Sequence, residues 1–422
     1  MFANLKQIFN PKNKDLQKRI LFTFAALFVF KLGIAIVVPG IDKEALGVGN
    51  LGFLELVNAM GGGAMENFSI FSLGVMPYIT ASIIVQLLQM DIVPYFAELA
   101  KQGHTGRTKL NAITRYLGIF LAFIQGYMFS FAYIQGAEPL MYMQFAIVLT
   151  AGTAFLLWLG DQITAKGIGN GISLIIMAGI IASMPAMFMS AWDSFVASGA
   201  TLGTFLGIVT FLLYVAVYFA VILGVLFVQL SERRVEIQYA NKSSAVLGKQ
   251  NYIPLKLNSA GVIPVIFASS IISIPAFIAQ FLGRDGVSSF IESWLTMNSL
   301  TGFLLFMTLI ILFSYFYTFI QIKPKDLAEN LQKSGGFIPA VRPGNETINY
   351  VTYILYRITF VGSIFLALMA GSPIIFGFLT TLPPSVTIGG TGLLIVVGVA
   401  LETFRQIENK LVSTSYVRGR RR

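Results

Sequence analysis

The sequence has 422 residues, of which 56% are hydrophobic and only 11% are charged, and its mean hydropathy is +0.76. Soluble domains carry about 25% charged residues, so this composition excludes an ordinary soluble protein. The formal net charge is +10 and there is no cysteine, which excludes disulfides, thiolate metal sites and thiol nucleophiles. We therefore expect an all-α polytopic membrane protein.

Apolar runs long enough to cross a bilayer, which takes about 20 residues, recur along the whole chain. They predict ten transmembrane helices at residues 20–38, 75–90, 112–134, 140–159, 171–189, 205–229, 259–281, 301–321, 350–370 and 391–408. Five of these spans precede the loop near Gly199 and five follow it. Because the number per half is odd, the second half enters the membrane from the opposite side. The pattern predicts two inverted five-helix halves, at 20–189 and 205–408.

Most of the 29 Lys and Arg residues fall in alternate connecting segments. These are the N-terminal segment 1–19, the connection between the second and third spans, the turn at Lys166, the loops 230–258 and 322–349, and the tail 409–422. With ten spans they all lie on one side, which the positive-inside rule makes cytoplasmic. Both termini are therefore expected in the cytoplasm.

The first apolar run, 20–38, follows a basic leader. It is too long for the apolar core of a signal peptide and lacks a small-residue cleavage site, so a retained span is favoured over a cleaved signal. Lys31 inside this run is expected to snorkel or to pair within the bundle rather than to act in transport. Arg357 is expected to pack between helices, and Glu402 lies near the cytoplasmic end of the last span. None of the three indicates a proton relay.

The segments 58–72 and 74–88 differ from the other runs. The second predicts a membrane helix with Pro77 in its opening turns, whereas the first, NAMGGGAMENFSIFS, is too short and too rich in glycine to cross a bilayer. A half-helix or re-entrant segment is therefore expected, and non-helical backbone at membrane depth must be buried in protein or face a water-filled cavity. Pro264 has a matching place near the start of the seventh run.

Residues 159–176, LGDQITAKGIGNGISLII, contain a glycine-rich turn. The turn lacks the lysine–hydroxyl pair and the preceding strand of a nucleotide-binding loop, so we interpret it as a tight turn into the fifth span. The sequence has no HExxH, no GxSxG and no intramembrane aspartate pair, and its one histidine, His104, lies in a charged loop. We expect no enzyme activity and no cofactor or metal.

The loops 230–258 and 322–349 are polar, basic and long enough to project from the membrane. Cationic loops gathered on one face predict a large anionic partner. Ribosomal RNA, an acidic protein surface and anionic lipid all satisfy this prediction.

Six segments together resemble the SecY family, the channel subunit of the bacterial Sec protein translocase. In the order and spacing of that family they are GVMPYITASIIVQLL (74–88), AELAKQGHTGRTKLNAITRY (97–116), LGDQITAKGIGNGISLII (159–176), NSAGVIPVIFASSII (258–272), SGGFIPAVRPGNET (334–347) and GGTGLLIVV (389–397). The resemblance covers nearly the whole chain. It implies a clamshell of ten helices in two inverted halves, with a lateral gate between spans two and three on one side and seven and eight on the other.

The function that the resemblance implies is a protein-conducting channel of the bacterial cytoplasmic membrane. Such a channel passes unfolded secretory proteins across the membrane and releases hydrophobic segments sideways into the bilayer. A secondary carrier for a small solute is the alternative, because carriers share inverted repeats and broken helices. A carrier would need polar or ionisable ligands at the midplane, and the sequence offers few. A structural membrane scaffold is the third possibility.

The resemblance also assigns site residues in the membrane. The segment 58–71 resembles the plug on the extracellular side of the pore, represented by Asn58, Gly61, Gly62, Gly63, Asn67, Phe68, Ile70 and Phe71. The apolar pore ring maps to Val75, Ile79, Ile172, Ile176, Ile266 and Ile395. A ring of this kind resists water and ions by dewetting. Asn58 and Asn170 map to a polar contact between the plug and the channel wall that favours the closed state.

On the cytoplasmic side, Arg342 of the RPG at 342–344 resembles the partner-binding element of its loop, and Arg233 and Arg234 match the start of the other long loop. Lys242 and Lys249 stand where arginines are expected, and lysine does not reproduce the bidentate arginine fork on phosphate. The partners implied are the SecA motor ATPase, the ribosome with its RNA, the small membrane subunits SecE and SecG, signal sequences and nascent secretory chains, and membrane lipids. The driving force is expected from the motor or from a translating ribosome.

Overall fold

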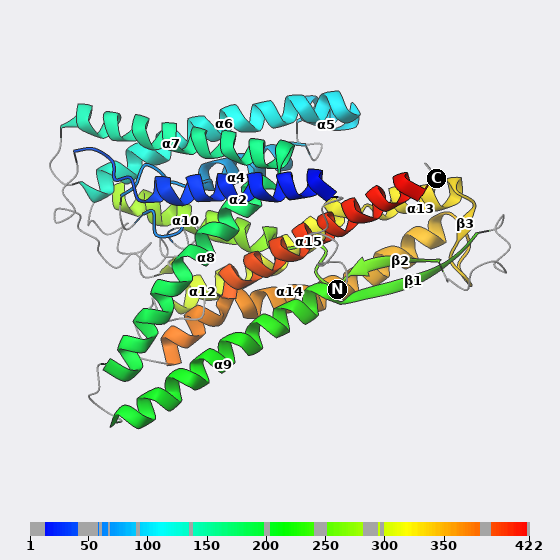
Figure 1. The fold of residues 1–422 in the computed structure, drawn as a ribbon. Coiled ribbons are helices and arrows are strands. Elements are labelled where there is room, and N and C mark those ends of the chain that lie inside the picture. The colour runs from blue at the N-terminus through cyan, green and yellow to red at the C-terminus, as the bar shows by residue number, and fades with distance from the viewer. Residues whose placement is uncertain are drawn as a thin grey trace. The chain divides into compact units, whose positions relative to one another are not determined.

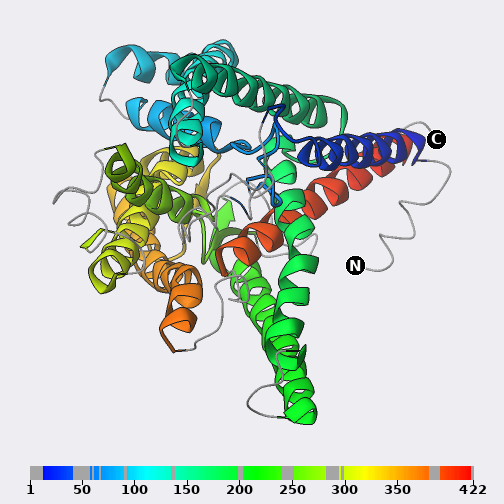
Figure 2. The ribbon, with the colours of Figure 1, turned by 90° about the vertical axis from the view of Figure 1, so that its left-hand side faces the viewer.

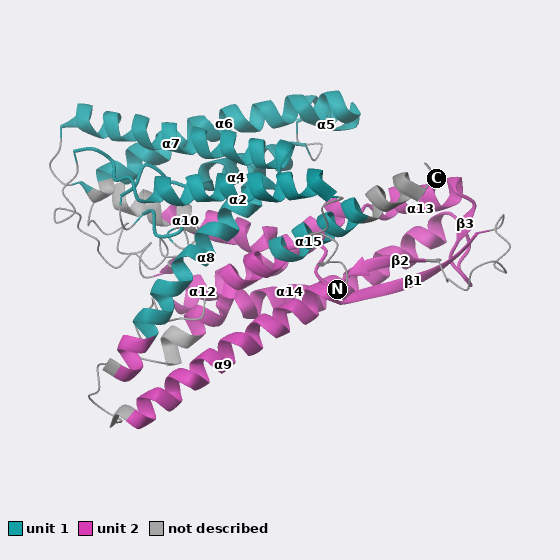
Figure 3. Cartoon of the chain, in the orientation of Figure 1, with its two compact units in different colours: residues 1–191, 277–289, 399–422 teal, residues 192–276, 290–398 magenta. Residues whose placement is uncertain are grey.

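The computed structural model describes residues 13–40, 58, 61–65, 68–89, 93–134, 138–197, 203–239, 251–281, 294–295, 299–379 and 390–419. Over these residues the chain is built from helices and one small sheet (Figure 1). It divides into two compact units (Figure 3). The first comprises residues 1–191, 277–289 and 399–422, and the second comprises 192–276 and 290–398.

A helix lies at each of the ten predicted runs, which confirms the fold class. In chain order these are α2 (Lys14–Ile34), α4 (Met76–Leu88), α6 (Gly103–Tyr133), α7 (Pro139–Lys166), α8 (Gly171–Trp192), α9 (Gly203–Leu230), α10 (Ile263–Phe281), α12 (Leu300–Gln321), α14 (Asn345–Leu379) and α15 (Gly390–Gly419). Among the described residues, seven helices are both long and apolar enough to span a membrane. The division into halves at 20–189 and 205–408 stays a prediction.

Several helices extend beyond the apolar runs that predicted them. α6 begins at Gly103 and α14 continues to Leu379, because helical hydrogen bonding persists outside the strictly apolar stretch. Two further short helices, α5 (Pro94–Lys101) and α13 (Pro324–Lys333), both start with proline. The fixed φ of proline suits the first helical position, where no N–H partner is required.

In the first unit, α6 packs against both α4 and α7. Glycines allow the backbones to approach: a Cβ on Gly118 would lie 3.2 Å from the Cα of Tyr78, and one on Gly126 would lie 3.3 Å from the Cα of Ala146. An ion pair between Arg115 on α6 and Asp161 on α7, at 2.7 Å, adds a polar contact. This pairing was not predicted, because the two residues lie in different apolar runs.

In the second unit, the π-helical turn η3 (Asp193–Ala197) continues α8 and packs against α9, as Figure 2 shows. α10 meets α12 through Phe267, whose ring lies 5.3 Å from that of Phe313. α12 in turn packs along α14. These contacts bury the apolar faces of the helices within this unit.

The two long loops that are predicted to be cytoplasmic contain regular structure. β1 (Glu232–Tyr239) pairs antiparallel with β2 (Asn251–Lys256) and with β3 (Gly336–Phe337), so the strand order is β2-β1-β3. Val235 and Ile237 of β1 are buried, while Glu236 between them and Gln238 after them are exposed, the alternation typical of a half-buried strand. A loop was expected here, and the prediction missed this alternation because basic residues flank it.

Candidate functional site

The described residues of the segment 61–75, which are 61–65 and 68–75, form turns directly before α4. Gly62 and Gly63 have φ of +72° and +81°, and Gly74 has φ of +55°, conformations that glycine adopts without steric cost. A Cβ on Gly62 would also lie 3.1 Å from the Cα of Gly179 on α8. The described part of this segment is therefore a non-helical re-entrant stretch, as the sequence predicted, and α4 starts with Pro77 in its first turn.

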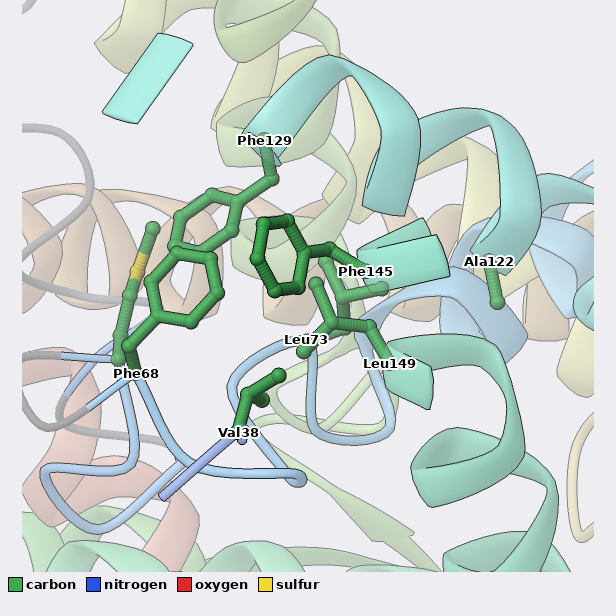
Figure 4. Close-up of a cluster of buried hydrophobic side chains, with 8 residues drawn as sticks. Val38, Phe68, Leu73, Ala122, Phe129, Phe145 and Leu149 are labelled. Carbon is green, nitrogen blue, oxygen red and sulfur yellow. The ribbon is translucent and has the colours of Figure 1, made fainter. Parts of the chain in front are cut away.

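Phe68 anchors this segment in the first unit (Figure 4). Its side chain is fully buried, stacks on Phe129 of α6 at 5.2 Å between ring centroids, and meets Phe145 of α7 edge-on at 6.4 Å. The surrounding cluster consists of Val38, Met65, Phe68, Leu73, Ala122, Phe129, Phe145 and Leu149. Phe68 has φ of +44°, which is unfavourable for a bulky side chain, so packing holds a strained backbone in place.

Phe71 forms a second anchor between α2 and α7. Its ring stacks on Phe30 at 6.1 Å and on Phe155 at 5.9 Å. A Cβ on Gly33 would lie 1.9 Å from the Phe71 ring. A Cβ on Gly152 would lie 1.9 Å from the carbonyl oxygen of Ile70, the residue before Phe71. Only glycine at these two helical positions leaves room for the segment.

Hydrogen bonds satisfy the non-helical backbone at the two anchors. The N–H of Val38 donates to the carbonyl of Phe68, and the N–H of Ile70 donates to the carbonyl of Ile36, both at 3.0 Å. The Ser72 hydroxyl donates to the carbonyl of Ala64 at 3.0 Å. Backbone polar groups at membrane depth need such partners. Residues 68–72 are thus fixed by both packing and hydrogen bonding.

The two asparagines of the predicted plug contact each have a local role. Asn58 Oδ1 accepts from the N–H of Met65 at 3.1 Å. Asn170 Oδ1 accepts from the N–H of Ile172 at 3.1 Å and from that of Ser173 at 3.4 Å, so it caps α8. Their mutual contact stays a prediction, and Asn67 lies outside the described residues.

The predicted pore-ring residues lie on or next to four helices. Val75 immediately precedes α4 and is buried, while Ile79, four residues later, is half-buried; Ile172 and Ile176 show the same spacing on α8. Residues four apart share one helix face. In the second unit, Ile266 on α10 is half-buried and Ile395 on α15 is buried. Each pair in the first unit therefore shares a face, and the ring as a whole stays a prediction.

The glycine-rich turn before α8 is a close-packed joint. A Cβ on Gly171 would lie 1.9 Å from the carbonyl oxygen of Gly160, and Gly169 has φ of +84°. Thr23 Oγ1 of α2 accepts from the N–H of Ile168 at 3.1 Å. The interpretation as a tight turn into the fifth span is confirmed.

In the two long loops, the sheet rests on the start of α14 and on α13. We call this assembly, residues 232–239, 251–256 and 324–347, the docking platform. Its core is small and apolar: Val235, Leu255 and Ile338 pack against Val351 and Leu355 of α14. Charged side chains of the sheet, such as Arg234 and Glu236, are exposed to water.

The three described cations of the predicted docking site are all exposed. Arg234 Nε donates to Glu232 Oε1 at 3.0 Å, and its guanidinium lies 4.8 Å from the centre of the Tyr252 ring. The hydrogen bond to Glu232 raises the pKa of Arg234. None of the ion pairs among the described residues includes Arg233 or Arg342. Lys242 and Lys249 lie outside the described residues.

Hydrogen bonds fix the backbone of Arg342, while its side chain is exposed to solvent. Its N–H donates to Glu346 Oε2 at 3.4 Å, and its carbonyl accepts from the Thr347 hydroxyl at 3.0 Å. Gly344 has φ of +104°, so the RPG turn depends on this glycine. The loop therefore fixes the position from which the guanidinium extends.

One expectation is wrong. Arg357 does not pack between helices of this chain: it is exposed on α14, with its guanidinium 4.3 Å from the centre of the Tyr353 ring. Hydropathy detects a span but not which face of it a cation occupies. Lys31 on α2 and Glu402 on α15 are also exposed.

Comparison with known sequences gives consistent matches. The SecY family model matches residues 69–404. The protein translocase subunit SecY of Halalkalibacterium halodurans is 48% identical, and the alignment covers 99% of this chain and 99% of the relative. The protein of the same name from Bacillus subtilis is also 48% identical, over 95% of this chain and 96% of the relative.

Two solved structures share the fold. One, from a study of the plug domain of the SecY protein and the closed state of the translocation channel, has a TM-score of 0.68 at 19% identity and covers 94% of this chain and 93% of its own. The channel in a canine ribosome–channel complex from the endoplasmic reticulum has a TM-score of 0.66 at 20% identity, with the same coverage.

Proposed function

Because the chain belongs to the SecY family, we infer that it is the protein-conducting channel of a Sec translocon in a bacterial cytoplasmic membrane, with both termini in the cytoplasm. It passes unfolded secretory proteins across the membrane and releases hydrophobic segments sideways into the bilayer. The observation that carries this function is 48% identity to a translocase subunit over 99% of the chain. The channel is not itself an enzyme, so partners supply the energy for transport.

The gate combines an apolar ring with a plug. The six ring residues, Val75, Ile79, Ile172, Ile176, Ile266 and Ile395, close the pore by excluding water. The plug is anchored at its C-terminal end, since Phe68 and Phe71 are packed against α2, α6 and α7. We expect the part of the plug that moves to precede these anchors, and a contact between Asn58 and Asn170 favours the closed state.

Removal of residues 61–67 tests this division of the plug. The deletion spares both aromatic anchors, so we expect transport of secretory proteins to continue while the resting channel conducts ions. The measurement is single-channel conductance in planar bilayers, together with transport of a model secretory protein into vesicles. A deletion variant as tight to ions as the wild type would contradict a sealing role for this segment.

The docking platform receives the cytoplasmic partners. Arg342 and Arg233 extend from fixed backbone into solvent, and such guanidinium groups suit phosphate and carboxylate ligands. The partners are a SecA motor and the ribosome, including its RNA; the ribosome is supported by the fold shared with a ribosome-bound channel. SecE and SecG complete the membrane complex.

Site-specific crosslinking of an arrested secretory chain tests the channel function. A photoreactive residue at Ile176 or at Ile266 should crosslink to the arrested chain. The matched control is Leu212, which is exposed on α9 and is expected to contact lipid only. Crosslinks at Leu212 but at neither isoleucine would refute the proposed path. A carrier for a small solute predicts no crosslink to a polypeptide at any of the three positions.

A further inference from the structure

The exposed side chains of α14 change from tyrosines to apolar residues at Arg357. Tyr350, Tyr353 and Tyr356 are exposed on the N-terminal side of this arginine. On its C-terminal side the exposed large side chains are Phe360, Val361, Ile364 and Leu368. Tyrosines concentrate where a membrane meets water, and aliphatic side chains face its hydrocarbon. Arg357 thus lies at the boundary between the headgroup layer and the hydrocarbon.

The guanidinium of Arg357 reaches back toward the headgroup layer. It lies 4.3 Å from the centre of the Tyr353 ring, one helical turn nearer the start of α14. Helical side chains incline in this direction, and long cationic side chains use it to leave the hydrocarbon. No ion pair between described residues includes Arg357. A cation at this depth without a counterion is costly, so the position favours an anionic ligand.

The aromatic surface next to Arg357 is supported by α12. The Tyr356 ring lies 4.8 Å from that of Phe319 and 5.9 Å from that of Tyr315. The Tyr315 hydroxyl donates to the carbonyl of Tyr356 at 3.4 Å. This turn of α14 is therefore held in place from the neighbouring helix. Lys323, exposed just beyond the end of α12, adds positive charge on the same side.

We propose that Arg357, stacked on the ring of Tyr353, binds the phosphate of an anionic phospholipid from the surrounding bilayer. With one face over the tyrosine ring, the planar guanidinium has its N–H groups directed outward, where they can form paired hydrogen bonds to phosphate oxygens. The acyl chains then lie along Phe360 and Ile364. A protein carboxylate would satisfy the charge equally, but the aliphatic stretch directly beyond the cation matches a lipid. The site requires neither the pore ring nor Arg342.

Fluorescence quenching by brominated lipids tests the proposal. The full chain, with its three tryptophans replaced as Trp158→Phe, Trp192→Phe and Trp294→Phe, receives Tyr353→Trp, which retains an aromatic face for the cation. It is placed in nanodiscs of phosphatidylcholine with brominated phosphatidylglycerol or brominated phosphatidylcholine. One interfacial cation should favour the anionic lipid by about fivefold. Arg357→Gln should abolish this preference and Arg357→Lys should retain most of it.

A second tyrosine provides the matched control. Tyr116 on α6 is exposed and follows an arginine, but Arg115 is already paired with Asp161 at 2.7 Å. Tyr116→Trp in the same background should therefore show no preference for the anionic lipid. Equal quenching by both lipids at position 353, or a preference that survives Arg357→Gln, overturns the proposal. Absence of quenching by either lipid also overturns it and indicates that protein covers the site.

Discussion

The re-entrant segment 61–75 and the docking platform both interrupt the helices, yet they are stabilised in different ways. The segment lies at membrane depth by prediction, and its backbone is paired with residues 36–38 while its aromatic side chains are buried between helices. The platform is predicted to lie outside the membrane, and it has only a small apolar core beneath a sheet. Irregular backbone in hydrocarbon requires a partner for every polar group, whereas water supplies those partners at a sheet surface. Substitutions should therefore affect stability in the segment and partner binding on the platform.

The largest effect on stability is expected from Phe68→Ala. Truncation of a fully buried phenylalanine lowers the free energy of unfolding by about 3–5 kcal/mol. Here it leaves a cavity and removes the ring contacts with Phe129 and Phe145. Thermal denaturation of the purified protein in detergent measures the loss. Phe205→Ala, at an exposed position on α9, is the control and should change little. Equal effects of the two substitutions would contradict an anchoring role for Phe68.

On the docking platform, Arg342→Glu should weaken partner binding without lowering stability. If the guanidinium is desolvated in the complex, the loss of binding free energy is about 2–5 kcal/mol. Sedimentation of ribosomes or of SecA with proteoliposomes that contain the channel measures it. Lys325→Glu reverses another exposed cation of the platform and should have a smaller effect. Similar losses from both variants would show that only the overall charge of the platform matters.

A smaller loss of stability is expected from Gly152→Ala. The added Cβ would lie 1.9 Å from the carbonyl oxygen of Ile70, and such overpacking costs about 1–3 kcal/mol. Gly224→Ala on α9 is the matched control, since a Cβ there meets nothing within 4 Å. The control should be neutral or stabilising, because alanine favours helix more than glycine does. A thermal midpoint unchanged by Gly152→Ala would mean that the segment moves aside easily.

The smallest effect is expected from Arg234→Gln. Its hydrogen bond to Glu232 lies on the exposed face of the sheet, where ion pairs contribute little to folding. The thermal midpoint should stay within error of the wild type, whereas Val235→Ala, one residue away and buried, should lower it. If Arg234→Gln lowered the thermal midpoint as much as Val235→Ala, the charged face of the platform would contribute to folding stability.

Local patterns in the sequence predicted the helices and their interruption. Hydropathy located all ten helical runs, Pro77 marked the start of α4, and the glycines at 167–171 predicted a tight turn. The anchors were not predicted, because Phe68 meets Phe129 and Phe145, which are distant in the sequence and lie in runs of uniform hydropathy. The sheet in the long loops was missed because its apolar positions, Val235 and Ile237, are few and flanked by charges.

The bridge between Val37 and Ser69 connects the chain after α2 to the anchor of the plug. The two flanking amides, those of Val38 and Ile70, donate across this bridge to the carbonyls of Phe68 and Ile36. Their exchange with deuterium therefore requires the anchor to separate from residues 36–38. If the gate opens without moving the anchor, both amides stay protected during transport. Rapid deuterium labelling of the Val38 and Ile70 amides during transport would instead show that the anchor moves with the plug. The exchange rate of these two amides therefore reports how far the gate opens.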